Sequence, residues 1–131
     1  MSEGNVEVIR AVWEAWNTGD MDTVRKMHDP EVILRTVEDW PEQGPYLDRE
    51  AVMRFYQQLR DTWDTDTLEA SSDFLHRADR VVVRLTLHGV GHGPRADLEY
   101  TVVYSVRKGK IREVEFFQDH DEALEAVGLS E

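Results

Sequence analysis

The sequence contains no cysteine in its 131 residues, so it can form no disulfide and carry out no thiolate chemistry. It also lacks any apolar run near the roughly 18–20 residues of a membrane-spanning helix, and its first residues do not have the pattern of a signal peptide. A chain of this length is expected to form one domain, residues 1–131, with a substantial core. These absences favour a cytoplasmic protein.

Positive charge is scarce and dispersed. The chain has 15 Lys and Arg against 27 Asp and Glu, which gives a formal net charge of −12 at pH 7. The basic residues are scattered among acidic ones, so the surface would repel a nucleic-acid backbone or an anionic membrane. Neither nucleic acid nor a membrane is therefore an expected partner.

Apolar residues in the first half of the chain recur with helical spacing. A first helix is predicted by residues three and four positions apart, at Val6, Ile9, Val12, Trp13 and Trp16. Gly19 should follow its end, and Asp20 should cap a short second helix that closes at Asp29-Pro30. After a β-like segment over residues 31–37, Asp48 should cap a third helix, whose apolar face carries Val52, Phe55, Tyr56, Leu59 and Trp63.

The second half of the chain has the composition of strands. Segments rich in Val, Leu, Thr, Tyr and Phe predict strands over residues 68–77, 80–91, 96–108 and 111–118. Arg107-Lys108-Gly109-Lys110 is predicted to be a tight hairpin connection. Helices followed by antiparallel strands indicate an α+β fold, in which helices gather on one face of a curled sheet and leave a cavity open at one end.

The C-terminal segment begins like a strand and ends like a helix, with Asp119 and His120 at the change. Asp119 and Glu122 have the spacing of a capping box, and Gly128 stands where a left-handed C-terminal residue is wanted. A short helix is therefore predicted over residues 120–127. Capping is a sufficient explanation for Asp119, and acid/base chemistry is the alternative. His120 should point to the opposite sheet face from Asp119, so the two are not expected to act as a pair.

Three phrases that span nearly the whole chain resemble the SnoaL-like branch of the nuclear transport factor 2-like superfamily. They are EAWNTGDMDTVRKMHDPEV, DWPEQGPYLDREAVMRFYQQL and FFQDHDEALEAVGL. The resemblance implies a cone-shaped, curved antiparallel sheet wrapped around N-terminal helices, the cystatin-like roll. It also implies a hydrophobic pocket and, commonly, a homodimer packed through the outer face of the sheet.

The resemblance does not select one activity, because this fold hosts cyclases, isomerases, hydrolases and non-catalytic modules. Ketosteroid isomerases of the superfamily have a base aspartate where this chain has about Thr36. Limonene epoxide hydrolase relatives have an Arg-x-Asp pair where this chain reads Arg84-Leu85-Thr86. Polyketide cyclases of the SnoaL type use an acid/base aspartate near the closing strand, for which Asp119 is the nearest match. A cyclase-like or lyase-like activity is the interpretation that remains.

The candidate catalytic residues are Asp119 and Arg84. Asp119 would serve as acid or base if burial raised its pKa, and Arg84 would orient a carbonyl or anionic ligand if its strand face is concave. If that face is convex, Arg84 is an ordinary solvent or interface residue. The candidate ligand-binding residues are Thr36, Trp40, Tyr46, Tyr56, His88, Tyr104 and Phe117. Core packing is the alternative for the aromatic ones, and the core is the assignment for Trp13, Trp16 and Trp63.

No metal ion or cofactor is expected. His88 and His92 would lie about 13 Å apart along a strand, too far to share a metal ion. The glycine-rich GVGHG at residues 89–93 is similar to a nucleotide-binding loop, but no helix follows it to hold a phosphate. We expect a turn there.

Three functions remain open. The first is a small cofactor-free enzyme that cyclises, isomerises or hydrates an apolar metabolite by acid/base chemistry. The second is a module that binds such a ligand without changing it, and the third is a dimerisation domain with a vestigial pocket. A homodimer is expected in each case, because apolar residues of the strands should leave an apolar outer face, at Val82, Val90, Val103, Val114 and Phe116.

Overall fold

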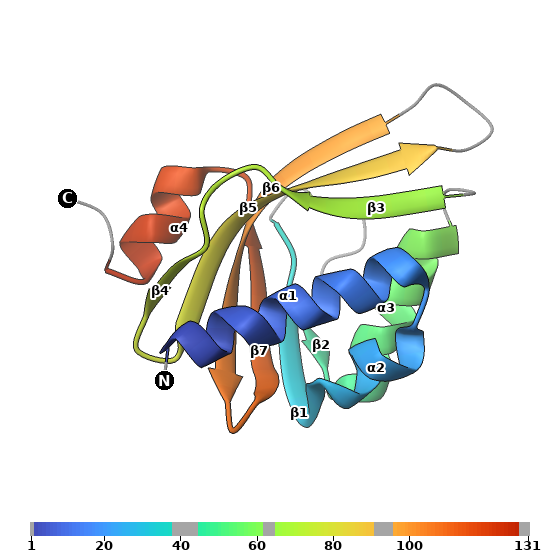
Figure 1. The fold of residues 1–131 in the computed structure, drawn as a ribbon, viewed down its shortest axis with the longest axis horizontal. Coiled ribbons are helices and arrows are strands. Elements are labelled where there is room, and N and C mark those ends of the chain that lie inside the picture. The colour runs from blue at the N-terminus through green and yellow to red at the C-terminus, as the bar shows by residue number, and fades with distance from the viewer. Residues whose placement is uncertain (1, 38–44, 62–64, 91–95, 129–131) are drawn as a thin grey trace.

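The computed structural model describes residues 2–37, 45–61, 65–90 and 96–128. Its elements, coloured in chain order in Figure 1, are α1 (Ser2–Thr18), α2 (Met21–Lys26), β1 (His28–Arg35), β2 (Tyr46–Leu47), α3 (Arg49–Asp61), β3 (Thr65–Ala70), β4 (Leu75–Arg77), β5 (Arg80–Val90), β6 (Ala96–Arg107), β7 (Lys110–Phe117) and α4 (His120–Ala126). This order confirms the predicted α+β class.

All seven strands belong to one sheet, in the order β2-β1-β7-β6-β5-β3, with β4 paired to β5 as well. Every pairing is antiparallel except that of β1 with β7, which is parallel. The early strand therefore returns beside the last one. Figure 1 shows α1 lying across the sheet, with α2 and α3 on one side of the view and α4 on the other.

The junction between α1 and α2 forms as predicted. Gly19 has a φ of +82°, which glycine adopts at little cost, and Asp20 caps α2 by accepting hydrogen bonds from the backbone N–H and the hydroxyl of Thr23. The end of α2 was predicted too late, because Asp29 and Pro30 already belong to β1. The pairing of β1 with β7 shifts register between His28 and Ile33, and this irregularity accommodates a proline without an N–H.

The strand predicted over residues 68–77 is two strands instead of one. The last pair of β3 is Ala70 with Leu85, and the first pair of β4 is Leu75 with Val82. Four residues, 71–74, thus lie opposite two residues, 83 and 84, of the partner strand. The backbone N–H of Ser71 donates to the Arg84 carbonyl at 2.8 Å, so the extra residues stay against β5 as a bulge. Bulges increase the local bend and twist of a sheet, which is how this edge curls.

The two faces of the sheet carry separate apolar clusters. Val81, Val83, Leu85 and Leu87 of β5 belong to the large inner cluster with α1 and α3, whereas Val82 belongs to a small outer one. The outer cluster consists of Val82, Val103, Ala123 and Val127, with Phe117 and Leu124 packed against it. The helix α4 therefore covers apolar surface that the sequence had suggested for a dimer interface.

The prediction that Val114 and Phe116 face outward is wrong. Directly paired residues share a face of a sheet, and Val114 pairs with Tyr104 while Phe116 pairs with Val102. Both partners lie in the inner cluster, so Val114 and Phe116 do too. The side chain of Val90 is outside the part of the chain whose side chains are described.

The last helix has the predicted ends. Asp119 Oδ1 accepts from the backbone N–H of Asp121 at 2.9 Å and of Glu122 at 3.4 Å, and Gly128 has a φ of +75°. The Arg77 guanidinium donates to the Gly128 carbonyl. A Cβ on residue 128 would lie 2.7 Å from that flexible guanidinium, which could move aside, so it is the positive φ that favours glycine here. The predicted contact of Leu124 with Leu129 lies outside the described residues.

Candidate functional site

A cavity of about 60 Å³ lies between the helices and the inner face of the sheet. Its lining combines aliphatic side chains with an aromatic wall formed by Trp13, Trp16, Phe55, Tyr56, Tyr100, Tyr104 and Phe116. No carboxylate is among the described residues that line it. The space is narrower than a typical small-molecule pocket of about 300–1,000 Å³, so a ligand larger than a few water molecules requires lining side chains to change rotamer.

Tyr104 of β6 presents the best-defined polar group of this wall. Its hydroxyl oxygen accepts a hydrogen bond of 2.9 Å from Trp13 Nε1. Burial raises the pKa of Tyr104 to about 12, so its hydroxyl is protonated at neutral pH. Within the described part of the chain, no acceptor takes the hydroxyl hydrogen. Tyr104 is therefore ready to donate to an oxygen atom of a bound molecule.

The hydroxyl of Tyr56 in α3 contacts the ring of His28, the first residue of β1. The Tyr56 hydroxyl and His28 Nε2 are 3.0 Å apart, and His28 Nδ1 lies 2.7 Å from the Val24 carbonyl oxygen. The His28 side chain is fully buried, and this burial lowers its pKa to about 4, so the imidazole is neutral at neutral pH. The pKa of Tyr56 is raised well above its ordinary value, first by burial and then by the proximity of Tyr104.

Trp16 contributes an unused donor to the same wall. Its indole Nε1 is buried and has no hydrogen-bond partner among the described residues. The Trp16 ring meets the Tyr56 ring edge-on, with centroids 5.4 Å apart, and the Arg60 guanidinium lies 4.9 Å from the Trp16 ring centre. An unpaired buried N–H costs about 1–3 kcal/mol, which an acceptor atom reaching Trp16 would recover.

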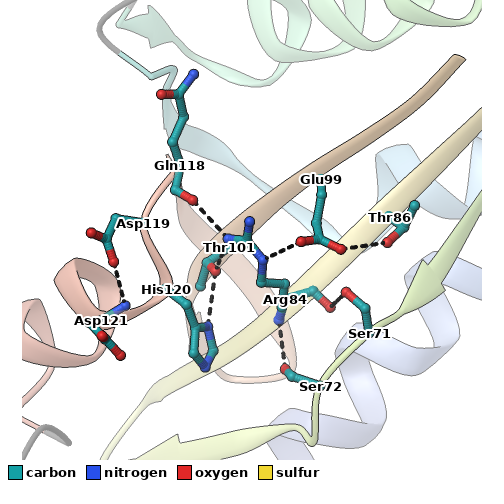
Figure 2. A network of polar contacts seen from close by, with 10 residues as sticks. All are labelled: Ser71, Ser72, Arg84, Thr86, Glu99, Thr101, Gln118, Asp119, His120 and Asp121. Carbon is teal, nitrogen blue, oxygen red and sulfur yellow. Dashed lines mark hydrogen bonds and ion pairs between the residues drawn. The ribbon is translucent and has the colours of Figure 1, made fainter.

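A second polar cluster lies on the opposite face of the sheet, around Arg84. Its Nε donates to Glu99 at 2.9 Å, and its terminal nitrogen donates to Thr101 Oγ1 at 2.9 Å and to the Gln118 carbonyl at 2.8 Å. Figure 2 shows Arg84 at the centre of this network, with His120 joined to Thr101 at 3.0 Å. The guanidinium thus fastens the turn between β7 and α4 to the sheet.

The two candidate catalytic residues are not brought together. Figure 2 shows Asp119 directed at the backbone N–H of Asp121, while Arg84 reaches the carbonyl of Gln118. Asp119 is exposed and caps α4, and neither it nor Arg84 lines the cavity. Arg84 lies on the face of the sheet opposite the cavity, so it is not placed to orient a ligand bound there.

The candidate ligand-binding residues divide between the two faces. Thr36, Tyr56 and Tyr104 line the cavity. Tyr46 packs against Phe55, with ring centroids 4.9 Å apart. His88 lies on the outer face, 3.4 Å from Glu69, and Phe117 packs in the outer cluster. Trp40 and the predicted core residue Trp63 are outside the described residues, as is His92.

The sequence predicts no role for His28 and only a core role for Trp13 and Trp16. His28 stands in the phrase MHDPEV without a periodic or motif context, and only the folded chain brings it to Tyr56 of α3. Trp13 and Trp16 are buried, as predicted for core residues, but both also line the cavity. Their place on the same helical stripe was the one available indication.

The described residues contain neither a metal site nor a membrane-spanning helix. No group of three or more His, Asp or Glu side chains there is arranged to hold a metal ion. In the same part of the chain, no helix combines the length and apolarity needed to cross a membrane.

The α+β roll, a curved, unclosed sheet packed against helices, is shared with solved nuclear transport factor 2-like and cystatin-like folds, at TM-scores of 0.76 and 0.77. Residues 9–114 match the SnoaL-like domain family, and the chain belongs to that family. The resemblance in the sequence is thereby confirmed. None of the curated proteins matches the chain.

Solved structures agree with the fold. Bal32a, from a soil-derived mobile gene cassette, is 22% identical over 88% of each chain, with a TM-score of 0.79. TerC, co-crystallised with polyporic acid, is 22% identical over 95% of this chain and 97% of its own, with a TM-score of 0.76. A putative SnoaL-like polyketide cyclase from Jannaschia sp. CCS1 is 17% identical over 100% of this chain and 96% of its own, also with a TM-score of 0.76.

Proposed function

We propose that this protein binds an apolar, carbonyl-bearing small molecule in the inner cavity and rearranges it by acid/base chemistry, as a cyclase or isomerase does, without a cofactor. The observation that carries the proposal is the Tyr104 hydroxyl, buried in an apolar wall with its oxygen held by Trp13 and its hydrogen uncommitted among the described residues. Membership of the SnoaL-like family and the co-crystallisation of TerC with polyporic acid support a small-molecule ligand.

The chemistry follows from where Tyr104 lies. A carbonyl oxygen that accepts from its hydroxyl becomes a better acceptor as negative charge develops on it during enolisation or ring closure. In a cavity that excludes water, a positioned donor of this kind contributes about 10²–10³-fold to the rate. The Trp13 N–H fixes the Tyr104 oxygen in advance, so the donor needs no rearrangement when the charge appears.

A non-catalytic binding module is the second candidate. It is favoured by the narrowness of the cavity and by the lack of a carboxylate among its described lining residues. Asp119 and Arg84 do not enter the first proposal, since neither lines the cavity. Under the second candidate the ligand binds equally well but leaves the protein unchanged.

We also propose that the protein forms a homodimer, which packs through the part of the outer face that α4 leaves uncovered. That part is polar rather than apolar: a groove there is lined by Glu31, Ile33, Arg80, Arg112 and Glu113, among others. Charges of both signs can pair across a two-fold axis. Sedimentation at micromolar concentration tests this, and salt should weaken the dimer. A monomer at low salt would remove the claim.

The test of the cavity uses its own tryptophans. Because Trp13 and Trp16 line it, an apolar ketone that enters should change their fluorescence, and Leu87→Trp should abolish that binding by filling the space. Leu75→Trp is the matched control, since Leu75 is exposed on β4. Equal loss of binding in both variants, or unaltered binding in Leu87→Trp, would place the ligand elsewhere.

A further inference from the structure

We infer that Tyr56 and His28 form a two-step proton relay that removes a proton from the ligand held by Tyr104. The inference rests on the proposed function and deepens it, because it names the base and the substrate class: a small apolar ketone with an acidic hydrogen on the carbon beside its carbonyl. Tyr56 is the group that contacts the substrate. His28 is not part of the cavity lining and acts through Tyr56.

The hydrogen-bond partners of His28 fix its tautomer. The Val24 carbonyl oxygen can only accept, so the hydrogen of the neutral ring is on Nδ1. Nε2 then carries a lone pair, and the Tyr56 hydroxyl donates to it. The hydrogen of Tyr56 is thus committed to His28, which leaves the lone pairs of its oxygen as the free part of the group.

The hydroxyls of the two cavity tyrosines consequently have opposite hydrogen-bonding roles. Tyr104 accepts from Trp13 and has a hydrogen to offer, whereas Tyr56 donates to His28 and has lone pairs to offer. Both tyrosines line the same cavity, and Tyr104 is the second cause, after burial, of the raised pKa of Tyr56. A molecule that satisfies both must present an acceptor to Tyr104 and a hydrogen to Tyr56. An enolisable ketone meets this condition with neighbouring atoms.

The relay step balances without any further reactant. The bond between the α-carbon and its hydrogen breaks, and the proton goes to the Tyr56 oxygen while the hydroxyl proton of Tyr56 moves to His28 Nε2. The electron pair left on carbon forms the C=C bond of an enolate, and the carbonyl π electrons move to the oxygen that Tyr104 holds. The reverse transfer returns the proton to a different carbon of a conjugated enolate, which gives an isomer, and nothing is oxidised or reduced.

The surroundings of His28 keep the relay ready over a wide pH range. Burial is the main cause that lowers its pKa, and the Arg49 guanidinium at the start of α3 also lowers it. Among the described residues, Tyr56 of the same helix also faces the ring. The imidazole is therefore a free base above about pH 5. When an enolate forms nearby, its negative charge favours the imidazolium and strengthens the base at that moment.

The experiment uses 3-cyclohexen-1-one, a small ketone whose isomerisation to the conjugated enone is followed by ultraviolet absorbance. Binding is measured separately by tryptophan fluorescence. The variants are Tyr56→Phe, which keeps the ring, and His28→Gln, which can still accept from Tyr56 but takes no proton at neutral pH. The matched control is His76→Gln, because His76 is exposed on β4.

The wild-type protein should bind the ketone and isomerise it faster than buffer does. Tyr56→Phe and His28→Gln should lower kcat by about 10²–10⁴-fold, the usual contribution of an acid/base group, while KM and binding stay unchanged. His76→Gln should behave like the wild type. The ¹⁵N shifts of His28 should also show a protonated Nδ1 and a bare Nε2, which a merely structural histidine is not required to have.

Each contrary result has a distinct meaning. Binding without isomerisation in the wild type overturns the relay and leaves the binding module. Isomerisation that persists in folded Tyr56→Phe overturns the relay and leaves the proposed function. The opposite His28 tautomer also overturns it. Failure of the ketone to bind overturns both proposals for this substrate class. If His28→Gln does not fold, Tyr56→Phe decides.

Discussion

The two faces of the sheet both hold hydrogen-bonded polar side chains, but the hydrogen bonds serve different purposes. On the outer face, Arg84 donates hydrogen bonds to Glu99, Thr101 and the Gln118 carbonyl, and α4 covers the neighbouring apolar residues. On the inner face, Tyr104 and Tyr56 are held by one partner each and keep hydrogen-bonding capacity toward a cavity. A network whose hydrogen bonds join a turn to the sheet is structural, whereas hydrogen-bonding groups left available in an apolar wall mark a candidate site.

The largest expected difference between the faces comes from placing a charge on each. Leu85 faces the inner core and is 5% exposed, while its neighbour Thr86 lies near Glu99 on the outer face. Leu85→Arg buries an unpaired charge and should destabilise by more than about 4 kcal/mol, enough to prevent folding. Thr86→Arg can pair with Glu99 and should stay within about 0.5 kcal/mol of the wild type. Urea unfolding measures both, and similar losses would erase the distinction.

The second difference is that the free energy of unfolding depends on pH through His28, which contacts the cavity residue Tyr56. The pKa of His28 is lowered from 6.5 to about 4 in the folded protein, so the unfolded chain binds the proton more readily. Stability from this group is fully present above pH 6.5 and is lost as pH falls toward 4. This pKa shift corresponds to a loss of about 3 kcal/mol in the free energy of unfolding.

Urea denaturation of wild type and His28→Gln at pH 7, 6, 5 and 4 checks this. The wild type should lose more stability than the variant between pH 6.5 and 4. Parallel curves would show that His28 titrates alike in the folded and unfolded states. Other groups contribute equally to both proteins, so the difference between the curves isolates His28.

A third, smaller effect tests whether the outer network is structural. Arg84→Met removes the donors that fasten the turn before α4 and leaves Thr101 and the Gln118 carbonyl with fewer partners. We expect a loss of about 1–2 kcal/mol in the free energy of unfolding. Ketone binding in the cavity should not change. Loss of binding at unchanged stability would return Arg84 to the site.

The smallest effect separates the two roles considered for Asp119. Asparagine caps a helix about as well as aspartate, while alanine costs about 1 kcal/mol. Asp119→Asn should therefore be nearly silent in thermal unfolding and in turnover, and Asp119→Ala should lose stability alone. A melting temperature kept by Asp119→Asn together with turnover reduced about 10²–10⁴-fold would instead identify Asp119 as the acid or base.

Features that depend on neighbouring residues could be predicted from the sequence. Gly19, Asp20 and Asp119 each act within a few residues of themselves, and each lies where the capping rules put it. The class of fold followed from the change of hydrophobic period along the chain. The break between β3 and β4 did not, because the residues at 71 and 72 are held by β5 rather than by their own strand.

The face of a strand and the pairing of distant side chains could not be predicted in this way. The prediction that Val114 and Phe116 face outward is wrong because the alternation along β7 alone does not say which face is the inner one. The pairing of β7 with β6 decides it. His28 and Tyr56 are separated by 28 positions and meet only after β1 has inserted beside β7. Arg84 and Asp119 had suitable chemistry, but Arg84 lies on the outer face of the sheet and Asp119 caps α4, so neither lines the cavity.

The most direct test of the central claim, that the inner cavity is the functional site, is a crystal structure of the protein soaked with 3-cyclohexen-1-one. The account predicts ligand density against Trp13 and Trp16, with the carbonyl oxygen within hydrogen-bond distance of the Tyr104 hydroxyl and the adjacent carbon facing Tyr56. Density beside Arg84 and Asp119 on the outer face, with the cavity closed by its own side chains, would contradict it.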